Sequence, residues 1–90
     1  MLPYLDIAVT EPSQVGEARR AAARLAAAFE FDETTAGRVA LVVTELGTNL
    51  VRHAQRGRLL VGARREGDGV RFEVLSIDHG PGMTDDFLRL

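Results

Sequence analysis

The stretch TELGTNLVRHA, residues 44 to 54, places two polar side chains one helical turn apart among apolar ones. Glu45 and Asn49 are four residues apart, so on a helix they project from the same face. A carboxylate and a carboxamide oxygen are hard ligands that suit Mg²⁺ when water and phosphate oxygens complete its shell. The carboxylate could also orient or deprotonate a hydroxyl. A solvated pair on a helix surface has the same spacing, so these residues alone leave both interpretations open.

The helix predicted around this pair extends from Glu33 to Ala54, with Asp32 as its N-cap. Its apolar arc consists of Ala36, Val39, Val43, Leu46 and Leu50. The opposite side carries Arg38, Glu45, Asn49 and Arg52, and this polar stripe is flanked by Leu41 and Val42. We therefore expect this helix to be covered on more than one side.

The other elements follow from apolar spacing and turn residues. Residues 4–9 predict a strand, and Thr10 to Ser13 start a helix that ends near Phe31. Residues 58–65 and 70–77 predict two strands joined by the turn 66–69, which contains two glycines. The predicted order is strand, helix, helix, hairpin and loop.

A second motif, SIDHGPGM, occupies residues 76 to 83 at the exit of the last predicted strand. Asp78 could accept a hydrogen bond from an amino group such as that of adenine. Gly80 and Gly82 would let the backbone approach a ligand closely. An ordinary turn leaving a strand contains the same residue types, so this motif is also ambiguous on its own.

Together, in this order and spacing, TELGTNL and DHGPGM resemble the N box and the G1 box of the GHKL or Bergerat-fold ATPase superfamily. Within it the chain is similar to switch-protein serine kinases of the RsbT type and to anti-sigma-factor kinases of the RsbW type. The stretch from Ala18 to Ala54 also resembles the leading helices of that group. The resemblance implies an α+β fold, a two-layer α/β sandwich, with residues 1–90 as the N-terminal portion of one histidine-kinase-like ATPase domain.

The resemblance also implies a role for each matching residue. Asn49 would coordinate Mg²⁺ on the phosphates of ATP, and Glu45 would be the general base or would orient the attacking hydroxyl. Asp78 would recognise the adenine amino group, and Gly80 and Gly82 would form one wall of the nucleotide pocket. The implied phosphoacceptor is a serine on a STAS-domain partner, an anti-anti-sigma or scaffold protein. A sigma factor and a fused or associated serine phosphatase are further partners of this group.

One feature of the superfamily is missing from the sequence. Nothing after Gly82 resembles the second glycine-rich box of GTGLG character, and the chain ends MTDDFLRL. We therefore expect a fold truncated after the G1 box, without lid or final strands, either as a fragment or as a natural module. The sheet edge left open could support a homodimer.

Composition excludes some classes of function. The net charge of −2 gives no basic field for nucleic acid, and the sequence contains no cysteine and no apolar run long enough for a membrane span. We therefore expect a cytoplasmic protein that binds neither nucleic acid nor membrane. A local basic run is interpreted as a solvated face or as a docking surface for an acidic partner: Arg56, Arg58, Arg64 and Arg65.

Three functions remain open at this stage. The first is an ATP- and Mg²⁺-dependent serine kinase of a partner-switching pathway. The second is a non-catalytic module that binds a sigma factor or a STAS protein with little or no nucleotide. The third is the catalytic domain of a histidine kinase, which would need a phosphoacceptor histidine domain upstream.

Overall fold

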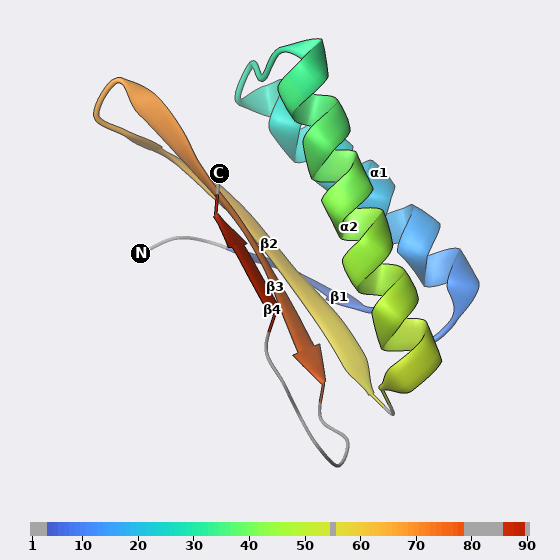
Figure 1. The fold of residues 1–90 in the computed structure, drawn as a ribbon. Coiled ribbons are helices and arrows are strands. Elements are labelled where there is room, and N and C mark those ends of the chain that lie inside the picture. Colours follow the sequence, from blue (N-terminus) through green and yellow to red (C-terminus); the bar gives the residue numbers. More distant parts are fainter. Residues whose placement is uncertain (1–3, 55, 79–85, 90) are drawn as a thin grey trace.

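The computed structural model describes residues 4–54, 56–78 and 86–89, the last four by their backbone alone. Two helices lie across one face of an antiparallel sheet, as shown in Figure 1. The elements in chain order are β1 (Tyr4–Ala8), α1 (Pro12–Ala28), α2 (Glu33–His53), β2 (Gly57–Glu66), β3 (Gly69–Asp78) and β4 (Asp86–Arg89). This arrangement confirms the expected two-layer α+β fold. Within the described ranges, neither helix combines the length and the hydropathy that crossing a membrane requires.

Local hydrogen bonds start both helices near the predicted residues. The Gln14 side-chain oxygen accepts from the backbone N–H of Thr10 at 2.7 Å and from that of Glu11 at 3.2 Å. The Asp32 carboxylate accepts from the backbone N–H of Thr35 at 2.7 Å, which confirms the predicted N-cap of α2. This hydrogen bond holds the pKa of the Asp32 carboxyl below its ordinary value.

The sheet has the order β1-β2-β3-β4, and all neighbouring strands are antiparallel. Leu59 pairs with Ser76 and Val61 with Val74, so these residues share one face. This face lies under the helices, and Leu59, Val61, Phe72 and Val74 are fully buried in it. The core of the domain therefore lies between the sheet and the two helices.

The expectation that no strand follows Gly82 is wrong. Backbone atoms of Asp86–Arg89 pair with β3, placing Asp86 opposite Ser76 and Arg89 opposite Glu73. The segment is short, begins with an aspartate and lacks a clear apolar alternation, so it gave no strand signal. Its strand conformation depends instead on hydrogen bonding to the edge of β3, a long-range contact that local sequence does not predict.

Close packing at a glycine sets the distance between the helices. A Cβ atom at Gly47 would lie 3.2 Å from Cγ1 of Val15. Since Gly47 has no side chain, the backbone of α2 can lie directly against Val15 of α1. The two helices therefore form one layer in which the C-terminal half of α2 lies beside the start of α1 (Figure 1).

Charged residues on the strands form ion pairs. Arg58 pairs with Asp6, Arg64 with Glu66 at 2.9 Å, and Arg65 with Glu30 at 3.4 Å. The guanidinium of Arg71 donates to both carboxylate oxygens of Glu66 and, together with Arg64, lowers the pKa of Glu66 to about 2. Three of the four arginines in the predicted basic run are thus paired within the chain, which favours a solvated face over a docking surface.

Candidate functional site

Part of the polar stripe of α2, together with two threonines, lines a hollow at the surface. It has a volume of about 310 Å³ and is lined by Thr44, Glu45, Thr48, Asn49 and Arg52. Glu45 and Asn49 are both exposed, so their oxygens are accessible from solvent. The structure therefore brings the predicted acid and amide together in one depression, on a helix whose other side is fixed in the core by Val39, Val43 and Leu50.

The chemistry of this hollow suits a phosphate-bearing ligand with a divalent cation. Glu45 and Asn49 supply two hard oxygens, too few for a cage made by protein alone but typical of Mg²⁺ bound with phosphates and water. Arg52 adds a guanidinium that can bind a phosphate oxygen pair. Thr48 adds a hydroxyl, whereas the Thr44 hydroxyl already donates to the carbonyl of Ala40 at 2.8 Å.

Asp78 is the last residue of β3 and pairs with Gly57. By the alternation of the strand it shares the helix-covered face with Ser76 and Val74, and it is half-buried. A Cβ at Gly57 would lie 2.9 Å from Cβ of Leu50, so α2 lies directly over this end of the sheet. Figure 1 shows the end of β3 and the last turns of α2 at the same end of the molecule.

The described part of the structure thus brings only some of the predicted site residues together. Glu45 and Asn49 line one hollow, and Asp78 lies at the same end of the domain without lining it. Gly80 and Gly82 lie outside the described residues. The expectation that α2 is covered on more than one side is wrong at Leu41. This side chain, one turn before Glu45, is 58% exposed.

Two threonines of the hollow were not predicted from the sequence. Thr44, Thr48 and Arg52 recur every fourth residue and so form a second line of side chains along α2 beside Glu45 and Asn49. That spacing was available in the sequence. Threonine in a helix gives no distinct signal for ligand binding, so the spacing alone does not identify these residues as part of a site.

Comparison with known protein families gives a match that covers most of the chain. The family model for the histidine kinase-like ATPase domain matches residues 8–89, a range that includes Glu45, Asn49 and Asp78. Comparisons with curated proteins and with solved structures give no match.

Proposed function

Because this chain belongs to the histidine kinase-like ATPase domain family, we propose that it binds ATP with Mg²⁺ and phosphorylates a serine of a STAS-domain partner. The observation that carries this proposal is the hollow on α2, where the acid Glu45 and the amide Asn49 lie beside Thr48 and Arg52. The resemblance of both sequence motifs to switch-protein kinases supports the serine as acceptor. Partner switching by an anti-sigma factor in the cytoplasm is the corresponding biological role.

Glu45 and Asn49 of the hollow, and Asp78 of β3, each have a defined task in this reaction. Asn49 would hold Mg²⁺ through its carboxamide oxygen. Glu45 would accept the proton of the serine hydroxyl as that oxygen attacks the γ-phosphorus, while ADP leaves. Asp78, at the end of β3, would accept a hydrogen bond from the adenine amino group.

The direct test is phosphotransfer from γ-labelled ATP to a STAS-domain protein encoded in the same genome, in the presence of Mg²⁺. We expect one serine to be labelled, and we expect Glu45→Gln to slow labelling by about 10²–10⁴-fold, the usual contribution of a general base. Glutamine has nearly the same shape, so this variant should unfold at the same urea concentration as the wild type.

The matched control is Arg38→Gln, which changes an exposed side chain of α2 that does not line the hollow. It should leave the rate unchanged. Failure to label any serine would overturn the kinase proposal. A stable complex with the STAS protein and no labelling would instead indicate the non-catalytic binding module.

A further inference from the structure

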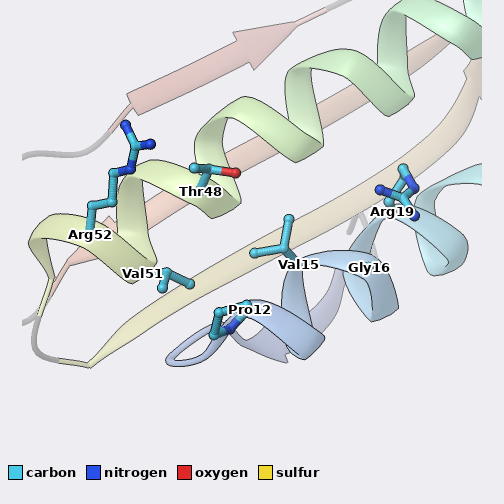
Figure 2. A pocket seen from close by; sticks show the side chains of 7 residues that line it. All are labelled: Pro12, Val15, Gly16, Arg19, Thr48, Val51 and Arg52. Carbon is cyan, nitrogen blue, oxygen red and sulfur yellow. The ribbon is translucent and has the colours of Figure 1, made fainter.

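A second depression lies between the two helices and adjoins the hollow on α2. It has a volume of about 440 Å³ and is lined by Pro12, Val15, Gly16, Arg19, Thr48, Val51 and Arg52. Thr48 and Arg52 line both depressions. We refer to it as the interhelical groove. Figure 2 shows Pro12, Val15 and Arg19 on α1 and Thr48, Val51 and Arg52 on the neighbouring α2, with Arg52 extending away from α1 in this view.

The interhelical groove combines an apolar centre with a positive charge at each end. Pro12, Val15 and Val51 supply apolar surface, and Figure 2 shows Arg52 and Arg19 at opposite ends with Thr48 and Val15 between them. The α1 side of the groove, from Pro12 to Arg19, is ~10 Å long, since a helix rises about 1.5 Å per residue. Three residues of an extended chain span ~10 Å as well, so a segment of that length matches this side of the groove.

The two arginines are available for a ligand. Both are exposed, and neither forms an ion pair or side-chain hydrogen bond with the part of the chain that the structure describes. Arg58, Arg64, Arg65 and Arg71 of the strands, in contrast, all pair with carboxylates. The guanidinium of Arg20 lies close to the groove as well, because its Nη1 is 3.2 Å from the position that a Cβ of Gly16 would occupy.

From this charge pattern we infer that the interhelical groove holds an acidic segment of the protein substrate, with carboxylates on Arg19 and Arg52 and an apolar side chain between them. Arginine binds carboxylates in a bidentate geometry, and a groove of this volume accepts a side chain such as leucine. The chain as a whole has a net charge of −2, whereas this groove is lined by two arginines. Its local positive charge would therefore favour an acidic segment as the ligand. The inference rests on the proposed function, since a segment held there would lie beside Glu45 and Asn49.

Docking can be measured without nucleotide, by recording the amide signals of the ¹⁵N-labelled protein during titration with a twelve-residue peptide of glutamate, leucine and glycine. We expect shifts at Gly16, Thr48 and Val51, and weaker binding at higher salt because screening reduces the attraction. Counterpart peptides with glutamine for glutamate, or serine for leucine, should bind at least about tenfold more weakly.

The variant that tests the arginines is Arg19→Ala combined with Arg52→Ala. Because both side chains are exposed and unpaired among the described residues, the protein should keep its amide spectrum and lose peptide affinity by about tenfold or more. Arg24→Ala, an exposed arginine of α1 that does not line the groove, is the matched control and should bind as the wild type does.

Binding of the glutamine peptide as tightly as the glutamate peptide would overturn the inference. So would shifts confined to the β2–β3 hairpin, or an equal loss of affinity in Arg24→Ala. Because the titration contains no ATP, its result is independent of phosphotransfer. An inactive protein that still binds the peptide contradicts the kinase proposal alone, and an active protein that does not bind it contradicts the docking inference alone.

Discussion

Replacing Gly57 by alanine is expected to lower the free energy of unfolding by about 1–3 kcal/mol, the usual cost of overpacking a core. The new Cβ would lie 2.9 Å from both Cβ and Cδ2 of Leu50 and 3.0 Å from the carbonyl oxygen of Val9. Neither the Cβ of Leu50 nor a backbone oxygen is the free end of a flexible side chain. The strand or the helix must therefore shift, and the pairing of Gly57 with Asp78 would shift with it.

The matched control is Gly37→Ala, because a Cβ at Gly37 would have no atom within 4 Å. Gly37 is exposed inside α2, where alanine is favoured over glycine by about 1 kcal/mol. Urea unfolding should therefore show opposite changes for the two variants. If Gly57→Ala were as stable as the wild type, this result would contradict the close contact between α2 and this end of the sheet.

Replacing Asn49 by alanine is expected to weaken Mg·ATP binding on the order of 100-fold. Disturbing a residue that merely supports a metal ligand costs about 10–100-fold in metal affinity, and Asn49 is proposed as a ligand itself. The substitution should not weaken the fold, because Asn49 is exposed and alanine is a better helix former.

Calorimetric titration with ATP, in the presence and absence of Mg²⁺, measures this effect. The wild type should bind more tightly with Mg²⁺, and the Asn49→Ala variant should show little difference between the two conditions. Arg38→Ala, on the same helix outside the hollow, should behave as the wild type. If Mg²⁺ increased the ATP affinity of the wild type and of Asn49→Ala equally, Asn49 would not be a ligand of the metal.

Local sequence signals predicted the elements well where one residue type determines the structure. Asp32 as a cap placed the start of α2 at Glu33, and the glycines of the turn 66–69 placed the β2–β3 hairpin within one residue at all four strand ends. The spacing of Glu45 and Asn49 likewise predicted that they share a surface, because the helix period fixes it.

Features that depend on contacts between distant segments were not predicted. Strand β4 forms by pairing with β3, and its own four residues carry little strand preference. The interhelical groove combines residues of α1 with residues of α2, and Arg19 and Arg52, 33 residues apart in the sequence, both line it. Ion pairs across strands, such as Arg58 with Asp6, likewise became visible only from the register.

The most direct test of a nucleotide site built by α2 and the end of β3 is a titration of the ¹⁵N-labelled protein with Mg·ATP. We expect the amide signals of Glu45, Thr48, Asn49 and Asp78 to shift along one saturating curve, which would show that both motifs contact one ligand. Unchanged signals at these four residues at millimolar Mg·ATP, or shifts confined to the β2–β3 hairpin, would contradict the account.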